Sequence, residues 1–144
     1  MNEIKVLFKK VHKKAIVPVY KHSGDSGADL FTIEQFVIRP GEIYVARTGI
    51  CIDIQKGIEA QIRPRSGLAL KGLSIVNTPA TIDSGYRGEI KVILVNLGNE
   101  ILRFERGDRF AQIVFAPVYK GYFIETAELE NTDRNTGGFG SSGV

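Results

Sequence analysis

The stretch Ile50-Cys51-Ile52-Asp53-Ile54-Gln55-Lys56-Gly57-Ile58-Glu59-Ala60-Gln61-Ile62 decides the fold class. Apolar residues alternate with other residues on both sides of Lys56-Gly57, and a period of two is typical of strands that bury one face. Lys56-Gly57 is a turn signal, because glycine adopts backbone conformations that other residues avoid. The stretch therefore predicts two short β-strands separated by a turn.

The same pattern continues along the chain. Glu89-Ile90-Lys91-Val92 alternates in the same way, whereas helical periodicity is hard to find. Further turn signals follow at regular intervals, at Pro40-Gly41, Asn77-Thr78-Pro79, Asp83-Ser84-Gly85, Leu97-Gly98-Asn99 and Arg106-Gly107-Asp108. Many short strands with this spacing predict an all-β sandwich or barrel of jelly-roll type. One short helix is expected after Arg65, with Ser66 capping a run that reaches Lys71.

Length and composition favour one domain. The chain has 144 residues with 43% hydrophobic content, which suits a single compact unit over residues 1–144. Residues 131–144 are rich in glycine and small polar side chains, so we expect a mobile C-terminal arm there. Cys51 is the single cysteine, which excludes an intrachain disulfide, and its apolar neighbours favour a buried, inert thiol.

Charge and hydropathy argue against several classes of protein. The net charge is only +3, and the lysines between positions 9 and 14 resemble a solvated face more than a nucleic-acid-binding stripe. No run approaches the ~18 apolar residues that span a bilayer, and early charges interrupt any signal-peptide core. We therefore expect a cytoplasmic protein that binds neither membranes nor nucleic acids directly. His12 and His22 lack neighbours at metal-ligand spacing, which argues against structural zinc.

Three clusters combine charged groups with turns. Asp29 follows a glycine turn at 26–28, where accepting hydrogen bonds from turn amides is its simplest role. The segment 64–67, Pro-Arg-Ser-Gly, suits a phosphate at a helix start, and equally an ordinary helix cap with a surface arginine. The segment 107–112 is predicted to be a turn leading into a buried strand, with Arg109 and Gln112 as its candidates for another role.

Two further clusters contain an aromatic ring. In residues 80–88, Asp83 could act as general base for a water and Tyr86 could pack flat on a sugar, although a plain hairpin turn is the alternative. In the tail, Arg134 and residues 137–142 resemble a phosphate cradle, because glycine amides and hydroxyls can surround an anion. Phe139 could stack on a base there. The alternative for this segment is a disordered tail.

In this order, the five clusters resemble the five motifs of the homotrimeric dUTPase family, over the span from Ser26 to Gly143. The resemblance implies a jelly-roll subunit in a threefold trimer, with three sites at subunit boundaries and each tail closing over a neighbour's site. It also implies Mg²⁺-dependent attack of water on the α-phosphate of dUTP. The products would be dUMP and pyrophosphate, which limits uracil in DNA and supplies dUMP for dTMP synthesis.

The resemblance further implies a role for each motif residue. Asp83 is the expected base, and Tyr86 would cover the deoxyribose and leave no room for a ribose 2′-hydroxyl. The backbone of residues 77–82 would read uracil, including Thr81 and Ile82, with the Asn77 side chain favouring uracil over cytosine. The phosphate ligands would be Arg65, Ser66, Gly67 and Gln112. The lid residues would be Arg134, Phe139, Gly140, Ser141 and Ser142.

The metal is expected to have no direct protein ligand. Mg²⁺ would bridge the phosphates and keep several waters, while Asp29 would accept hydrogen bonds from those waters or position the site. Arg87 and Arg109 would shape the turn or anchor the tail. Two residues depart from the family pattern: Ala80 and Asn135 both stand where the family usually has glycine.

Two other functions remain as alternatives. A dCTP deaminase has a related fold and an Arg-Ser segment, and it would release ammonia. A dUTPase-like binding protein would instead use the nucleotide to control contact with a protein partner. The turn around Asp83 and the glycine-rich tail favour the hydrolase over the deaminase. The presence of the expected base, phosphate ligands and lid argues against a purely non-catalytic binding protein, while a regulatory role beside catalysis stays open.

Overall fold

The computed structural model describes residues 2–143, so Met1 and Val144, the ends of the predicted domain and arm, lie outside the described residues. The described chain contains eleven strands and one short helix. In chain order these are β1 (Val6–Lys10), β2 (Ala28–Phe31), β3 (Phe36–Ile38), β4 (Ile43–Arg47), β5 (Ile50–Ile54), β6 (Ile58–Arg63), α1 (Ser66–Ala69), β7 (Leu73–Ile75), β8 (Ala80–Ile82), β9 (Lys91–Asn96), β10 (Leu102–Phe104) and β11 (Arg109–Pro117).

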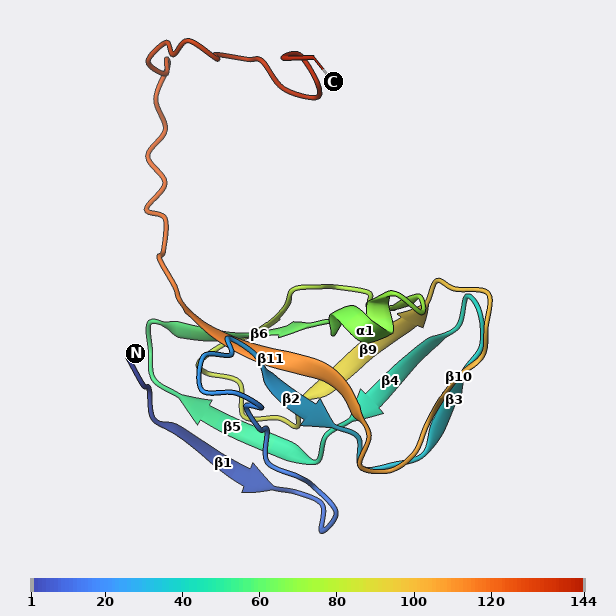
Figure 1. Ribbon diagram of the computed structural model, residues 1–144. Helices are drawn as coiled ribbons and strands as arrows, with labels where there is room; N and C mark the ends of the chain where they lie inside the picture. The colour runs from blue at the N-terminus through green and yellow to red at the C-terminus, as the bar shows by residue number, and fades with distance from the viewer. Residues whose placement is uncertain (1, 144) are drawn as a thin grey trace.

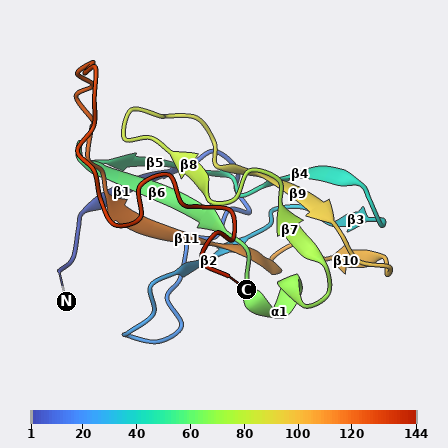
Figure 2. The same cartoon turned by 90° about the horizontal axis from the view of Figure 1, so that it is seen from above.

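The strands pair antiparallel in four small sheets around one core (Figures 1 and 2). The largest sheet has the order β2-β11-β6-β8, and a second sheet has the order β4-β9-β7. Two pairs, β1-β5 and β10-β3, complete the set. The arrangement confirms the predicted all-β, jelly-roll-like fold, and every turn signal read from the sequence lies between two strands.

The alternating stretch forms the strands that it predicts. In β5, Ile50, Ile52 and Ile54 are buried while Asp53 is exposed, and in β6 Ala60 and Ile62 are buried. All four sheets contribute side chains to the buried cluster. Burying one large aliphatic side chain stabilises the fold by about 1.5–3 kcal/mol. The inward-facing apolar residues of these strands therefore hold the sheets together.

Three local predictions were wrong in detail. Ser66 is the first helical residue and not the cap, because Arg65 supplies the extended N-cap backbone without a side-chain cap bond. The helix ends at Ala69, short of Lys71, and is followed by Gly72 with φ +95°. Cys51 is only partly buried, because it takes an outward position in β5 opposite Lys9.

The third alternating segment begins its strand two residues later than predicted. Strand β9 starts at Lys91, while Ile90 bonds instead to Thr48 and to Ile50, the first residue of β5. The N–H of Ile90 donates to the carbonyl of Ile50, and the N–H of Thr48 donates to the carbonyl of Ile90. Tertiary hydrogen bonding therefore replaces the strand pairing that the alternation predicts for Glu89 and Ile90.

The C-terminal arm begins earlier than position 131. After β11 the chain leaves the body at Val118, whose N–H donates to the carbonyl of Gly57, and it then runs away from the sheets (Figure 1). Large apolar side chains lie exposed along it, including Tyr119, Phe123 and Leu129. We call residues 118–143 the arm. The helix of residues 66–69 is far too short to cross a membrane, and no other helix occurs in residues 2–143.

Candidate active site

Asp29 and two arginines form a cluster at the ends of β2, β6 and β11. The Nε atom of Arg65 lies 2.9 Å from Oδ1 of Asp29, and Nη1 of Arg109 lies 3.4 Å from Oδ2. The Asp29 side chain is only 15% exposed. With two guanidinium groups around one carboxylate, the cluster carries a net positive charge, which suits an anionic ligand.

Gln112 joins the same cluster from the middle of β11. Its Nε2 donates to the carbonyl of Pro64 at 2.8 Å, which fixes the backbone immediately before Arg65. Its Oε1 lies over Gly27, where an added Cβ would come within 2.1 Å of that oxygen. Glycine at position 27 therefore makes room for the Gln112 side chain. We call Asp29, Arg65, Arg109 and Gln112 the Arg65 cluster.

Ser66 and Gly67 begin α1 beside this cluster, and both are exposed. Nothing lies within 4 Å of the position that a Cβ on Gly67 would take, so a ligand can approach its backbone amide. The structure thus places the four predicted phosphate ligands close together. These are Arg65, Ser66, Gly67 and Gln112, and Asp29 contacts Arg65.

Asp83 and Tyr86 lie in the turn between β8 and β9. The N–H of Tyr86 donates to the Asp83 carbonyl at 3.0 Å, which closes the turn. The Tyr86 ring lies against Gly88, where an added Cβ would meet its hydroxyl oxygen at 2.3 Å. The Asp83 carboxylate is exposed, and it makes no hydrogen bond or ion pair with any residue from 2 to 143. It is therefore available to a water molecule. We call residues 83–88 the Asp83 turn.

A cavity of about 200 Å³ lies beside the Asp83 turn. It brings together most of the predicted base-reading residues with Asp83 and Tyr86. Its lining residues are Asn77, Ala80, Thr81, Ile82, Asp83, Tyr86, Glu89, Lys91 and Ile93. Strand β8 is the edge strand of its sheet, so among the described strands one row of its backbone N–H and C=O groups has no strand partner. Such a row can recognise a planar ligand that carries both donors and acceptors.

The departure at Ala80 does not distort the strand. Ala80 pairs with Ile62 in β8 and is 9% exposed, and its φ lies outside the left-handed region that favours glycine. Its methyl group therefore packs into the core. Asn135, the second departure, adopts φ +43°, and Asn is one of the few residues that tolerate this conformation well.

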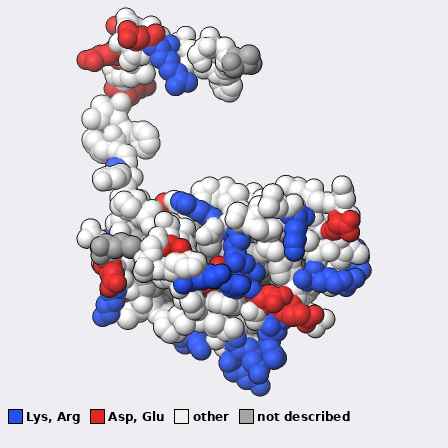
Figure 3. All heavy atoms as spheres, viewed as in Figure 1, with Lys and Arg blue, Asp and Glu red and all other residues white. Residues whose placement is uncertain are grey.

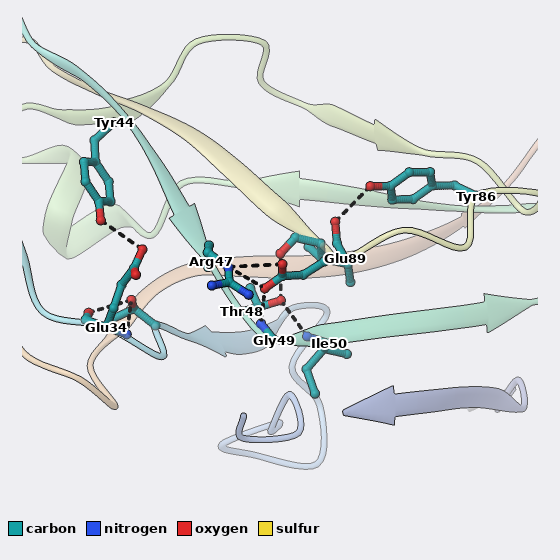
Figure 4. A network of polar contacts seen from close by, with 10 residues as sticks. Glu34, Tyr44, Arg47, Thr48, Gly49, Ile50, Tyr86 and Glu89 are labelled. Atoms are coloured by element: carbon teal, nitrogen blue, oxygen red, sulfur yellow. Dashed lines mark hydrogen bonds and ion pairs between the residues drawn. The ribbon is translucent and has the colours of Figure 1, made fainter. Parts of the chain in front are cut away.

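Three anchors of the Asp83 turn were not predicted from the sequence, namely Arg47, Asp53 and Glu89, whereas Arg87 was expected to shape the turn. Arg87 donates to the Ser84 carbonyl at 2.7 Å and to Oδ1 of Asp53 at 2.8 Å. Glu89 accepts hydrogen bonds from Arg47 and from the Gly49 N–H (Figure 4). Arg47 lies 42 residues before Glu89, so no local spacing could reveal this pair.

The predicted lid residues lie at the far end of the arm. Arg134 Nε donates to the Gly137 carbonyl at 2.8 Å, and Phe139 is fully exposed. Carboxylates of residues 125–133 precede Arg134 along the arm, as the red and blue atoms above the body show (Figure 3). In this single chain the arm touches neither the Arg65 cluster nor the Asp83 turn (Figure 1).

The Arg65 cluster and the Asp83 turn also remain separate within one chain. Arg65 and Arg109 border an open hollow of about 1090 Å³, which is otherwise lined mainly by α1 and residues 97–104. No residue lines both this hollow and the 200 Å³ cavity beside Asp83. The predicted functional groups therefore form three parts: the cluster, the turn and the end of the arm.

Asp29 is the carboxylate of the Arg65 cluster that bears on a metal ion. Among residues 2–143 no group of three or more His, Cys, Asp or Glu side chains is placed to hold one. Both oxygens of Asp29 already face guanidinium groups. Mg²⁺ commonly binds through substrate phosphates and its own waters, so this donor set fits a magnesium ion that arrives with a phosphorylated ligand.

Comparisons with known proteins agree with these motifs. The model of the dUTPase family matches residues 13–143. The chain is 52% identical to the deoxyuridine 5′-triphosphate nucleotidohydrolase of Hydrogenobaculum sp. (strain Y04AAS1), over 98% of this chain and 99% of that relative. It is 50% identical to the protein of the same name from Clostridium novyi (strain NT), over 98% and 100%. Among solved structures, the dUTPase of Staphylococcus bacteriophage 80alpha with dUPNHPP has a TM-score of 0.89, 29% identity, and coverage of 97% of this chain and 99% of that one.

Proposed function

The chain belongs to the dUTPase family, and on this premise we propose that it hydrolyses dUTP to dUMP and pyrophosphate with residues of the Arg65 cluster, the Asp83 turn and the arm. The observation that carries the proposal is the Asp83 turn. It places an unengaged carboxylate and a tyrosine ring at one small cavity that also contains Asn77 and Thr81. A plain hairpin turn requires none of these groups.

Asp83 acts as the general base in this proposal. Its carboxylate accepts a proton from the water that attacks the α-phosphorus, and phosphoryl transfer needs this water held in line with the leaving pyrophosphate. The exposed face of the Tyr86 ring covers the deoxyribose. Since Gly88 lies directly behind the ring, the ring can lie flat against the turn, and a ribose 2′-hydroxyl would collide with it.

The Arg65 cluster holds the triphosphate. Arg65 and Arg109 supply positive charge, Ser66 supplies a hydroxyl, and Gly67 an accessible amide. Gln112 keeps one amide hydrogen for a phosphate oxygen while the other holds the Pro64 carbonyl. Asp29 orients Arg65 through its 2.9 Å contact, which supports the positioning role among its two predicted roles.

The free edge of β8 reads uracil. Uracil presents two carbonyl oxygens and one N–H, and the backbone groups of residues 77–82 that face away from β6 offer complementary donors and acceptors. The Asn77 side chain at the same cavity favours uracil over cytosine. When bound, Mg²⁺ neutralises charge that develops on the phosphates.

The arm acts as a lid. It contains several carboxylates, so its attraction to a triphosphate depends on Arg134, on the glycine amides near it, and on the hydroxyls of Ser141 and Ser142. Phe139, fully exposed in the single chain, stacks on the base, and Gly140 provides the turn beside it with φ +85°. Closure excludes water other than the nucleophile.

The functional unit is a homotrimer. The separation of the Arg65 cluster from the Asp83 turn within one chain supports sites that take the two parts from different subunits. The exposed apolar side chains of the arm support its packing on another subunit. The free thiol of Cys51 is compatible with the reducing cytoplasm, where we place the activity.

The test is pyrophosphate release with Mg²⁺ from dUTP, dTTP, dCTP and UTP. We expect release from dUTP alone. Asp83→Asn should bind dUTP but lose most turnover, about 10²-fold or more, and a chain that ends before Arg134 should be strongly impaired. Equal turnover by Asp83→Asn would refute the base assignment. Ammonia release from dCTP would support the deaminase, and tight dUTP binding without turnover would support a nucleotide-controlled binding protein.

A further inference from the structure

Glu89 follows the Asp83 turn and is unusually buried for a carboxylate in a connecting segment. Its side chain is only 11% exposed. Oε1 accepts the N–H of Gly49 at 2.8 Å, and both oxygens lie 3.2 Å from Nε of Arg47 (Figure 4). A partly buried carboxylate with these partners is held in one position, because losing either partner would leave charge unpaired.

The backbone beside Glu89 is clamped by the same turn. The Thr48 hydroxyl donates to the Ile90 carbonyl at 2.7 Å, and the Ile90 N–H donates to the Ile50 carbonyl at 2.8 Å. Side-chain and main-chain bonds therefore fix residues 89 and 90 against residues 47–50. This explains why β9 begins only at Lys91.

Tyr86 takes its orientation from this clamped backbone. Its hydroxyl donates to the carbonyl oxygen of Glu89 at 2.9 Å (Figure 4). The other support of the ring is Gly88, which lacks a side chain beneath it. A shift of residue 89 would therefore move the hydroxyl's acceptor and tilt the ring.

We propose that Glu89 is a positioning residue for sugar selectivity: its carboxylate, held by Arg47 and the Gly49 N–H, fixes the carbonyl that orients Tyr86. The proposal rests on the proposed function, in which Tyr86 covers the deoxyribose. Glu89 lines the same 200 Å³ cavity as Asp83 and Tyr86, so a change at Glu89 acts directly beside the proposed sugar-binding residue. Arg47 acts through Glu89 in the same way.

The chain offers a matched control for this pair. Glu42 accepts the N–H of Arg39 at 2.8 Å and lies 3.7 Å from its guanidinium. Like Glu89, it accepts a backbone N–H and pairs with an arginine, but its side chain is 46% exposed against 11% for Glu89. Glu42 lies between β3 and β4 and does not line the cavity of Asp83.

The test compares kcat/KM for dUTP and for UTP in Glu89→Gln, Arg47→Met and Glu42→Gln, each with and without Tyr86→Phe. Glu89→Gln keeps the volume of the side chain and an acceptor for Gly49, but its amide faces Arg47 in place of a carboxylate oxygen. We expect it to lower the ratio of the dUTP value to the UTP value about tenfold. Arg47→Met should lower the ratio in the same direction, and it carries the test if Glu89→Gln fails to fold. Glu42→Gln should leave the ratio within about twofold of the unmodified chain.

The double variants distinguish an effect of Glu89 on the orientation of Tyr86 from a general disturbance of the local structure. Tyr86→Phe removes the hydroxyl through which Glu89 acts, so Glu89→Gln should change the ratio less than about twofold in that background. A loss of activity that is equal for dUTP and UTP would overturn the proposal, as would an undiminished effect of Glu89→Gln beside Tyr86→Phe. An unmodified chain that hydrolyses neither nucleotide, or both equally, would instead overturn the proposed function and the inference that rests on it.

Discussion

Ala80 shows at the residue scale how the chain departs from its family pattern without losing the local structure. A glycine is needed only where the backbone takes a positive φ or where another group approaches closely. Ala80 meets neither condition, since it is a regular strand residue whose methyl group is buried. Asn135 meets the first condition, and its side chain accepts the N–H of Thr132 at 2.9 Å within the same turn.

We predict that Ala80→Gly lowers the free energy of unfolding by about 1 kcal/mol, because glycine weakens a strand interior and removes a buried methyl group. Its kcat/KM for dUTP should stay within about twofold of the original value. Thermal or denaturant unfolding and steady-state kinetics measure the two effects. A large gain in activity would show that Ala80 obstructs the uracil site.

At this scale the sequence draws attention to side chains that stand close to a glycine. Arg65 precedes Gly67, and Tyr86 precedes the Gly88 against which its ring lies, so both could be singled out from the printed sequence. Arg47 and Asp53 could not. They reach Glu89 and Arg87 across 42 and 34 residues, and only the folded sheets bring them together.

At the scale of elements, the contact between the start of β2 and the middle of β11 depends on Gly27. A Cβ there would strike the Gln112 amide oxygen and displace the side chain from the Pro64 carbonyl. We predict that Gly27→Ala lowers kcat/KM for dUTP about tenfold, the effect of one lost hydrogen bond, while the fold is retained. Gly24→Ala is the control, since no atom lies within 4 Å of its added Cβ and its φ is not positive. Equal kinetics for the two variants would exclude a role for Gln112 placement.

Strand β4 provides a prediction on pH. Burial raises the pKa of Tyr44 above its ordinary value of 10.0, and the hydrogen bond to Glu34 at 2.9 Å raises it further. The folded chain therefore keeps this proton to higher pH than the unfolded chain. Its stabilising contribution is complete below pH ~10 and is lost as the pH rises through the folded-state pKa. Unfolding of Tyr44→Phe should accordingly show a weaker loss of stability above pH ~10, while its ring still stacks on Phe36. An identical alkaline slope for both proteins would contradict this.

Elements could be predicted where alternation and turn signals agree, as in residues 50–62, which form β5 and β6 with the expected faces buried. The prediction failed where tertiary bonds compete with local pattern. Ile90 alternates like a strand residue, yet it bonds to Thr48 and to Ile50 at the start of β5. Arg65 replaced Ser66 as the helix cap because its extended backbone precedes the first helical turn.

At the scale of the whole molecule, the arm begins where the last strand leaves the body, before the change in composition at position 131. Composition placed the start of the arm at position 131, because glycine and small polar residues dominate the sequence from there on, whereas residues 118–130 include several large apolar side chains. In the structure those side chains are exposed, and the body ends at β11. In the proposed trimer these side chains pack on another subunit, and the local pattern of one chain carries no signal of such a contact.

Mixing of subunits tests the proposed trimer. Arg65→Ala and Asp83→Asn should each be nearly inactive alone. If every site combines an Arg65 cluster and an Asp83 turn from different subunits, trimers reassembled from an equal mixture should recover about a quarter of the original activity. Light scattering during chromatography checks that the mixture is trimeric. Activity equal to the average of the two separate variants would mean that each site lies within one chain.

Hydrolysis of dUTP in ¹⁸O-labelled water tests the central claim most directly, because the labelled oxygen marks the phosphorus that the water attacks. If the water held by Asp83 attacks the α-phosphorus, mass spectrometry will find the label in dUMP and none in pyrophosphate. Label in pyrophosphate, or release of labelled inorganic phosphate, would show attack at another phosphorus and would contradict the account.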